Sequence, residues 1–357
     1  MVEKILIINP FGVGDILFST PLVSLIKKIY PGCYIGYICN IRTKDIIETN
    51  PEVSELFVFE RDEYRTLWKS SKVSCIKKFF NFWHEIKRRK FDVVIDLSLG
   101  KEYAFLCWLA GIKERLGFNY KGRGWFLTHK IAFNGFNDKP VSEYYLDIIR
   151  LRFDASRINR PQTVLFPSPK DEEYIGNFLK ESGVKEEDIL VGIAPGGGIS
   201  FGAKEQERRR WGVKEFAGLV DRIVKKFNVK VVLIWGLEEE PLVRKIAESM
   251  TERALIAPNT RIREMAALCK RCKIVICSEG GPLHIASSQG IKTISIFGPV
   301  DEKVYGPYPP GENNVVISSD VDCRPCYKRF KLSECNTRKC LERISIDKVF
   351  DAVCKLM

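Results

Sequence analysis

The segment Lys273–Pro299, KIVICSEGGPLHIASSQGIKTISIFGP, contains a complete strand–turn–helix–strand unit and decides the fold. KIVIC and TISIF are apolar runs rich in β-branched residues, which is typical of buried parallel strands. Between them, residues 279–282 (EGGP) predict a turn, and LHIASSQG predicts a short helix that ends at Gly290. A βαβ unit of this kind belongs to an open parallel sheet, in which ligands bind beyond the carboxyl ends of the strands.

The turn at residues 279–282 has two interpretations. Adjacent glycines let a backbone approach an anion closely, and the free N–H groups at a helix start attract phosphate. The alternative is a tight connection that binds nothing. Glu279 and His284 favour a ligand site, because an ordinary turn needs neither of these polar side chains.

The same strand–helix alternation extends through the rest of the chain. Buried strands are predicted at Lys4–Pro10, Cys33–Cys39, Leu56–Glu60 and Phe91–Ser98, with helical patterns between them. From Gly117 to Lys139 the pattern gives way to glycine-, aromatic- and base-rich sequence, for which we expect loops. The chain is therefore expected to be an α/β protein with doubly wound parallel sheets.

The alternation restarts with ILVGIAPGG at residues 189–197, which indicates a second domain. We expect an N-terminal Rossmann-like domain over residues 1–160 and a second domain over residues 161–340. The last segment, residues 341–357, is expected to form a helix that packs back on the N-terminal domain.

Composition limits the classes of protein to which the chain can belong. Its 57 Lys and Arg residues exceed its 45 Asp and Glu residues, so the formal net charge is +12. This excess suits an acidic partner: a phosphorylated small molecule, an anionic membrane surface or nucleic acid. No apolar run approaches the roughly 18 residues of a membrane span, and the N-terminus carries Glu3 and enters a strand directly, unlike a signal peptide. We expect a cytoplasmic protein whose twelve cysteines are mostly reduced, and three histidines do not favour a His-rich catalytic metal centre.

The first predicted strand runs into Gly12-Val13-Gly14-Asp15. A dinucleotide-binding GxGxxG fingerprint would need glycine at position 17, which is Leu17, so an oxidoreductase is disfavoured. Gly12 and Gly14 would still let the backbone approach a ligand. Asp15 is either a helix cap, worth about 1 kcal/mol, or a catalytic base, and both interpretations remain open.

The second domain carries a matching glycine loop at residues 194–198, APGGG, which includes Gly197. A cation cluster, RRRW at residues 208–211, lies between this loop and a predicted helix start. Arg209 or Arg210 could clamp a diphosphate, and the alternative is solvated surface charge. The acids at residues 238–240 could accept hydrogen bonds from a ribose diol or complement a helix dipole.

Four cysteines follow a C-x2-C-x8-C-x4-C pattern in a basic C-terminal loop: Cys323, Cys326, Cys335 and Cys340. Four thiolates within eighteen residues could bind a structural zinc ion tetrahedrally. The alternative is a set of free or redox-labile thiols.

Three segments resemble glycosyltransferase family 9, the ADP-heptose:lipopolysaccharide heptosyltransferases. They are GDILFSTPLVSLIKKIYP at 14–31, WGLEEEPLVRKIAE at 235–248 and SEGGPLHIASSQGIKTISIFGP at 278–299. The C-terminal cysteine segment and LERISIDKVFDAV also look like many members, so the resemblance covers nearly the whole chain. It implies a GT-B fold, in which two Rossmann-like domains face each other across a cleft. Residues 1–160 would then form the acceptor-side domain and residues 161–340 the domain that binds the nucleotide-sugar donor. It also implies inverting, metal-independent transfer from a nucleotide sugar without a cofactor.

The resemblance also implies roles for individual residues. Asp15 would take the proton of the acceptor hydroxyl. Arg209 stands where the family has a phosphate-binding lysine, and Glu240, with Glu239 as the alternative, stands at the ribose-binding acid. With the loop glycines, the candidate donor-binding residues are Gly12, Gly14, Gly197, Arg209, Glu240, Glu279, Gly280, Gly281 and His284. The chain departs from the family's usual Asp-Ser/Thr-Gly, because it has Glu279-Gly280-Gly281 there.

The expected function is transfer of a heptose from ADP-heptose to a lipopolysaccharide-core-like acceptor. Basic residues in the ranges 77–90 and 117–130 suit a phosphorylated glycolipid at the anionic inner face of the cytoplasmic membrane, although a solvated helix face explains them too. Nucleic acid is not expected as a partner. Two other functions remain: a nucleotide-sugar epimerase of the same two-domain architecture, and a non-catalytic nucleotide-binding protein.

Overall fold

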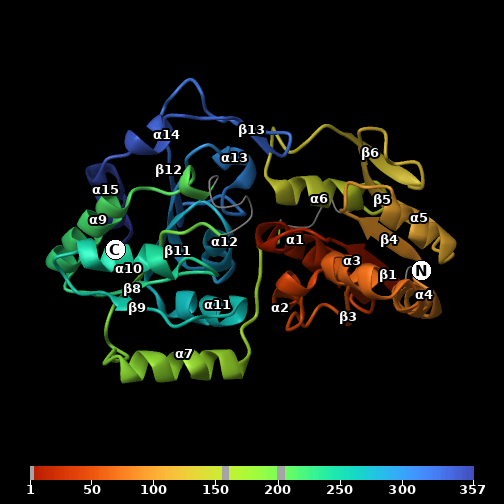
Figure 1. The fold of residues 1–357 in the computed structure, drawn as a ribbon, viewed down its shortest axis with the longest axis horizontal. Coiled ribbons are helices and arrows are strands. Elements are labelled where there is room, and N and C mark those ends of the chain that lie inside the picture. Colours follow the sequence, from red (N-terminus) through yellow and green to blue (C-terminus); the bar gives the residue numbers. More distant parts are fainter. Residues whose placement is uncertain (1–3, 155–160, 199–205) are drawn as a thin grey trace. The chain divides into compact units, whose positions relative to one another are not determined.

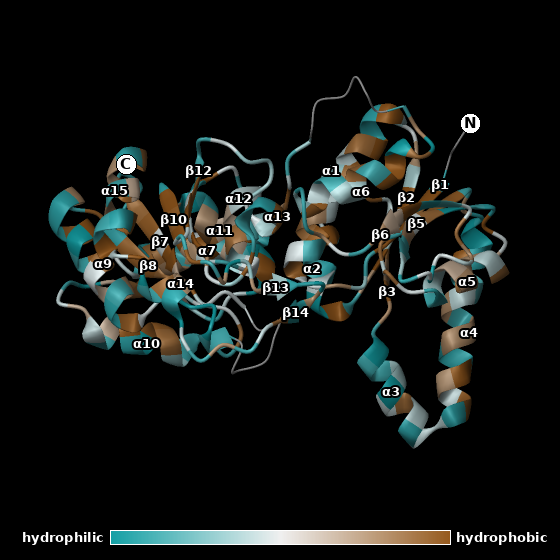
Figure 2. Cartoon of the chain, turned by 90° about the horizontal axis from the view of Figure 1, so that it is seen from above, coloured by the Kyte–Doolittle hydropathy of each residue, from teal (hydrophilic) through white to brown (hydrophobic). Residues whose placement is uncertain are grey.

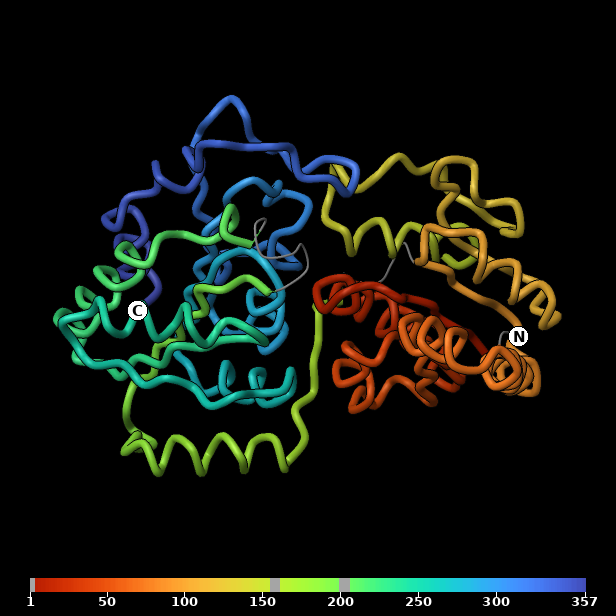
Figure 3. The backbone as a smooth tube through the Cα atoms, viewed as in Figure 1, coloured from red at the N-terminus to blue at the C-terminus, as the bar shows by residue number. Residues whose placement is uncertain are grey.

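The computed structural model describes residues 4–154, 161–198 and 206–357, and the chain divides into two compact units. Unit 1 comprises Met1–Phe136 and Val141–Gln162, and unit 2 comprises Asn137–Pro140 and Thr163–Met357. The backbone trace shows that each unit consists almost entirely of one continuous stretch of the chain (Figure 3).

Unit 1 contains, in its described part, a six-stranded parallel sheet with the order β3-β2-β1-β4-β5-β6 (Figure 1). Its strands are β1 (Lys4–Ile8), β2 (Tyr34–Cys39), β3 (Glu55–Val58), β4 (Val93–Asp96), β5 (Glu114–Tyr120) and β6 (His129–Phe133). The chain builds outward from β1 to β3 and then returns to the other side of β1. The strand order therefore reverses between β1 and β4, which is where open α/β sheets bind ligands.

Helices cover both faces of this sheet. They are α1 (Val13–Ile29), η1 (Ile41–Thr43), α2 (Lys44–Ile47), α3 (Arg61–Ser70), α4 (Lys72–Arg89), α5 (Glu102–Leu109) and α6 (Val141–Arg150). Leu6 and Ile8 of β1 share a buried cluster with Trp83 of α4 and Cys107 of α5. Because side chains alternate along a strand, neighbouring positions face the other layer, where α1 packs against α6.

The expectation of loops between Gly117 and Lys139 is wrong, because β5 and β6 are paired strands in this region. Along β6 exposed and partly buried positions alternate, as expected for the outermost strand of a sheet. His129 begins the partly buried side, and Ala132 lies with Lys130 on the exposed side, so the sequence lacks the apolar–polar alternation that marks a strand. The predicted strands over residues 4–10, 33–39, 56–60 and 91–98 correspond to β1–β4.

Unit 2 repeats the architecture with the parallel order β12-β11-β10-β7-β8-β9 within its described residues. The strands are β7 (Leu190–Ala194), β8 (Lys230–Leu233), β9 (Leu255–Ile256), β10 (Ile274–Ser278), β11 (Lys292–Ile296) and β12 (Asn314–Ile317). A separate antiparallel hairpin joins β13 (Tyr327–Lys328) and β14 (Lys331–Leu332). The strand order of the main sheet reverses between β7 and β10.

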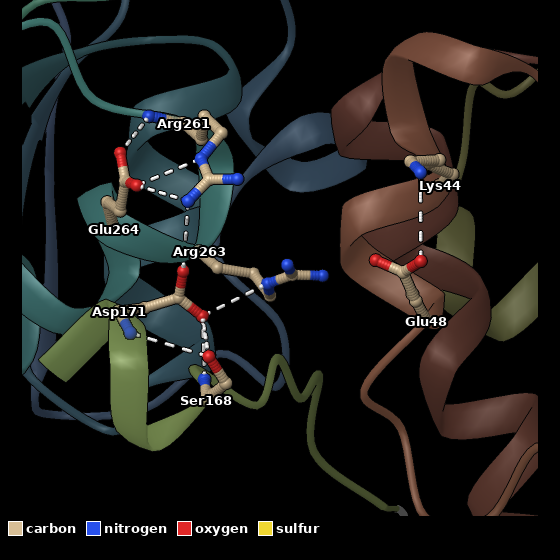
Figure 4. A network of polar contacts seen from close by, with 7 residues as sticks. All are labelled: Lys44, Glu48, Ser168, Asp171, Arg261, Arg263 and Glu264. Carbon is tan, nitrogen blue, oxygen red and sulfur yellow. Dashed lines mark hydrogen bonds and ion pairs between the residues drawn. The ribbon is translucent and has the colours of Figure 1, made fainter.

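The helices of unit 2 again form two layers. They are α7 (Pro169–Glu181), α9 (Val213–Phe227), α10 (Glu240–Ser249), α11 (Ile262–Arg271), α12 (Gly281–Ser288), α13 (Glu302–Tyr305), α14 (Lys339–Glu342) and α15 (Ile346–Leu356). α11 packs against α7 and α12, whereas α9 packs against α10 and α15. Figure 4 shows the polar contacts between α7 and α11: Ser168 caps α7, and Asp171 accepts a hydrogen bond of 3.1 Å from Arg263.

The C-terminal helix α15 packs against α9, β11 and β12, so these contacts lie in unit 2. Packing of residues 341–357 on the N-terminal domain stays a prediction. The buried face of α15, formed by Val349, Ala352, Val353 and Leu356, explains why the helix is held against the second sheet.

The two doubly wound parallel sheets confirm the predicted fold class. Among the residues that the structure describes, no helix has the length and apolar character needed to cross a membrane.

Candidate functional site

The candidate donor-binding glycines of unit 2 meet where its strand order reverses. Gly197 follows β7 and Gly280 follows β10, and both have positive φ angles, +92° and +139°. A β-carbon on Gly280 would lie 1.9 Å from the carbonyl oxygen of Gly197, so the contact requires glycine. Ser278 Oγ also donates a 2.8 Å hydrogen bond to the Pro195 carbonyl. The two turns therefore form one backbone surface at the carboxyl ends of neighbouring strands.

A buried ion pair supports the loop after β7. Glu239 Oε1 accepts hydrogen bonds of 2.9 Å from Gly198 N and from Arg210 Nη2, and Oε2 accepts one of 3.0 Å from Gly236 N. Arg210 Nε donates to the Gly196 carbonyl at 2.7 Å. Arg210, one of the two candidate diphosphate clamps, therefore holds the glycine loop.

Glu240 has a different environment from its neighbour. It begins α10, and its carboxylate pairs with Arg244 at 2.5 Å. The side chain of Glu240 is 41% exposed, whereas that of Glu239 is 1% exposed. Of the two candidate ribose ligands, Glu240 is therefore the one that solvent and ligands can reach.

The second ion pair of this region joins Arg209 to Glu279 across the two turns. Arg209 Nε lies 2.5 Å from Glu279 Oε1, and both side chains are largely buried. Burial raises the pKa of Glu279, and the Arg209 guanidinium opposes this rise. Within the described part of the chain, Glu279 Oε2 is buried and has no hydrogen-bond partner. The site therefore holds one buried carboxylate oxygen able to receive a further donor.

His284 lies on α12, whose first residue is Gly281. Burial lowers the pKa of His284 to about 4, and the positive charge of Arg209 acts in the same direction. At neutral pH the imidazole is therefore uncharged and can donate one hydrogen bond. The N–H groups of the first turn of α12 have no partner within their own helix, as at every helix start, so they favour an anion there.

The first-domain candidates lie at the start of α1. Gly12 is the N-cap, Gly14 lies in the first turn, and Asp15 Oδ2 accepts a 3.2 Å hydrogen bond from Gly12 N. Asn9 Nδ2 donates to the Asp15 carbonyl at 3.0 Å. Burial raises the pKa of Asp15 to about 6. The capping role is thus observed, and the raised pKa is compatible with a second role as a general base.

Sequence reasoning missed Asp96, the last residue of β4. It pairs in register with Ile8 of β1, so it lies beside the strand that leads to Gly12. Asp96 Oδ1 accepts a 2.9 Å hydrogen bond from Ser98 N, and burial raises the pKa of Asp96 to about 6. The sequence feature that could have indicated Asp96 is an acid at the end of an otherwise apolar predicted strand. That strand lies where the strand order of the sheet reverses.

The four C-terminal cysteines differ in exposure. Cys323 is exposed, Cys326 and Cys335 are partly buried, and Cys340 is buried. Burial and the nearby cysteines raise the pKa of Cys340 to about 11. In the described ranges, no three His, Cys, Asp or Glu side chains are arranged to hold a metal ion. The zinc site therefore stays a prediction.

Comparisons with known proteins show which family the chain is similar to. The model of glycosyltransferase family 9 (heptosyltransferase) matches residues 79–336. Lipopolysaccharide heptosyltransferase 3 of Escherichia coli is 25% identical over 315 residues, which cover 85% of each chain.

Solved structures show the same fold. The glycosyl transferase family 9 structure from Veillonella parvula is 21% identical, with a TM-score of 0.80 over 99% of this chain and 97% of that one. The structure of E. coli ADP-heptose lps heptosyltransferase II is 18% identical, with a TM-score of 0.76 over 99% and 98%. These similarities confirm the GT-B fold. The chain belongs to glycosyltransferase family 9 and is a glycosyltransferase.

Proposed function

We propose that this glycosyltransferase moves a heptose from ADP-heptose to a lipopolysaccharide-core-like acceptor, with inversion and without a metal ion. The observation that carries the donor assignment is the joined pair of glycine turns in unit 2, flanked by Arg209 and the start of α12. The E. coli structure named ADP-heptose lps heptosyltransferase II shares this fold and supports the choice of donor.

The donor diphosphate lies at the turn of Gly280 and Gly281 in this proposal. The helix start of α12 and the guanidinium of Arg209 stabilise its negative charge, which grows as the sugar leaves. His284, uncharged at neutral pH, donates a hydrogen bond instead of adding a second cation. Glu240 accepts hydrogen bonds from the ribose diol, because its carboxylate is exposed and that of Glu239 is not.

Asp15 is the base in the proposed reaction. The acceptor hydroxyl oxygen forms a bond to the anomeric carbon while the bond from that carbon to the diphosphate oxygen breaks, and the hydroxyl proton passes to Asp15. A pKa of about 6 leaves the carboxylate ionised at neutral pH and still basic enough to take a proton. The acceptor is a phosphorylated glycolipid or glycan at the cytoplasmic face of an anionic membrane.

Asp15→Asn should lower turnover by about 10²- to 10⁴-fold, because asparagine cannot accept the proton, while donor affinity is retained. In the unchanged protein, kcat/KM should decrease as the pH falls below about 6, since protonation removes the base. Asparagine can still accept the hydrogen bond of Gly12 N, so an unchanged melting temperature of Asp15→Asn would show that the cap is retained. Unchanged turnover in Asp15→Asn, measured with purified donor and acceptor, would contradict the assignment.

Glu240→Gln and Glu239→Gln should separate ribose binding from loop support. Glu240→Gln should weaken donor binding, measured by calorimetry, and change the free energy of unfolding by less than about 1 kcal/mol, because its ion pair is exposed. Glu239→Gln leaves a largely buried arginine without its counterion and should lower that free energy by about 3–5 kcal/mol. Equal effects of the two variants on stability would show that the buried pair does not support the loop.

A thermal-shift comparison of ADP-, GDP-, UDP- and dTDP-sugars should identify an ADP-sugar as the stabilising donor. A ligand at 100 times its dissociation constant stabilises the folded state by about 2.7 kcal/mol, so the preferred base should be evident. Preferential stabilisation by another base would contradict the ADP-heptose assignment. Isomerised sugar formed without an acceptor would instead indicate an epimerase.

A further inference from the structure

Helices α3 and α4 form a hairpin that extends from the body of unit 1 (Figure 2). Within the described residues, α3 buries none of its side chains, and α4 buries Cys75, Trp83 and Ile86. Both helices nevertheless carry large apolar side chains. A helix surrounded by water is not stabilised by exposed apolar side chains, so their presence on this hairpin indicates a binding surface.

An apolar groove of about 1190 Å³ lies along this hairpin and α5. Its walls include Phe59, Tyr64, Trp68, Phe79 and Phe105. This volume exceeds the roughly 300–1,000 Å³ of ordinary small-molecule pockets. The groove is therefore large enough for a long hydrocarbon group.

The apolar surface continues beyond the groove. Trp68, Ile76 and Phe80 line it and are exposed. On the α5 side, the ring of Phe105 lies 4.9 Å from that of Phe126 and 6.0 Å from that of the exposed Trp108. A contiguous exposed apolar surface of this kind marks an interaction site.

Cations accompany these aromatic residues. The segment 61–90 contains ten Lys or Arg residues and three Asp or Glu residues, a net charge of +7. The guanidinium of Arg61 lies 5.5 Å from the centre of the Tyr103 ring, and Lys72 Nζ lies 5.8 Å from that of Trp68. Aromatic side chains beside Lys and Arg suit a membrane interface, where rings contact acyl chains and cations contact phosphate.

The positive charge of residues 61–90 favours one occupant of the groove over another. A second copy of the chain would bring one +7 segment against another, which is unfavourable. An anionic lipid surface complements both the cations and the apolar groove. We propose that the α3–α4 hairpin docks on an anionic bilayer and that an acyl chain occupies the groove. This deepens the proposed function, which requires a membrane-bound acceptor.

Vesicle flotation tests this site without donor or acceptor. The full chain should bind vesicles of phosphatidylcholine with phosphatidylglycerol, bind poorly to phosphatidylcholine alone, and dissociate as salt is raised. Ile76→Glu should lower partitioning by about tenfold or more. The variant loses the apolar contact of Ile76 with the bilayer and gains a carboxylate that the anionic lipid repels. Ile189→Glu in unit 2 is the matched control, since Ile189 is 46% exposed and Ile76 is 45% exposed. It should bind as the unchanged protein does.

Equal binding by Ile76→Glu and the unchanged protein, with equal melting temperatures, would overturn the proposal. Binding that is independent of the anionic lipid would overturn it as well. A dimer that Ile76→Glu dissociates in sedimentation would show that a second copy occupies the groove. Donor stabilisation, measured separately on the same variant, distinguishes these failures from failure of the proposed transferase function.

Discussion

The candidate site of unit 2 depends on one contact, the backbone approach of Gly197 to Gly280. Adjacent parallel strands bring the ends of β7 and β10 together, but the turns can meet only if neither carries a side chain at these positions. The positive φ angles of both residues add a second reason for glycine. Arg209, Glu279 and the start of α12 are placed by this contact.

Two neighbouring arginines act differently around that contact. Arg210 is held by Glu239, whose two oxygens also bind backbone N–H groups on either side, so this pair supports the loop. Arg209 pairs with Glu279, whose second oxygen is buried and lacks a partner among the described residues. Burying a charge is costly unless it is compensated, so such an oxygen is expected where a ligand supplies the missing donor.

The alternation of apolar strands and amphipathic helices was enough to predict two doubly wound sheets. β5 and β6 were not predicted because β5 carries Glu114, Arg115 and Asn119, and the outermost strand β6 begins with His129 and Lys130. Local motifs indicated the turns at Gly197 and Gly280, but not that their backbones touch, since the sequence does not show which strands are neighbours. Glu239 and Glu240 could not be distinguished either, because their environments depend on where α10 begins. Asp96 could be recognised as a candidate only from the register between β4 and β1, which the sequence does not show.

In the proposed function, the joined glycine turns of unit 2 hold the diphosphate of the sugar donor. A crystal structure of the protein with ADP would show whether they do. Phosphate oxygens are expected at hydrogen-bond distance, about 2.7–3.2 Å, from backbone N–H groups at the start of α12 and from Arg209. A diphosphate bound elsewhere in unit 2, with no contact to the turn at Gly280 and Gly281, would contradict it.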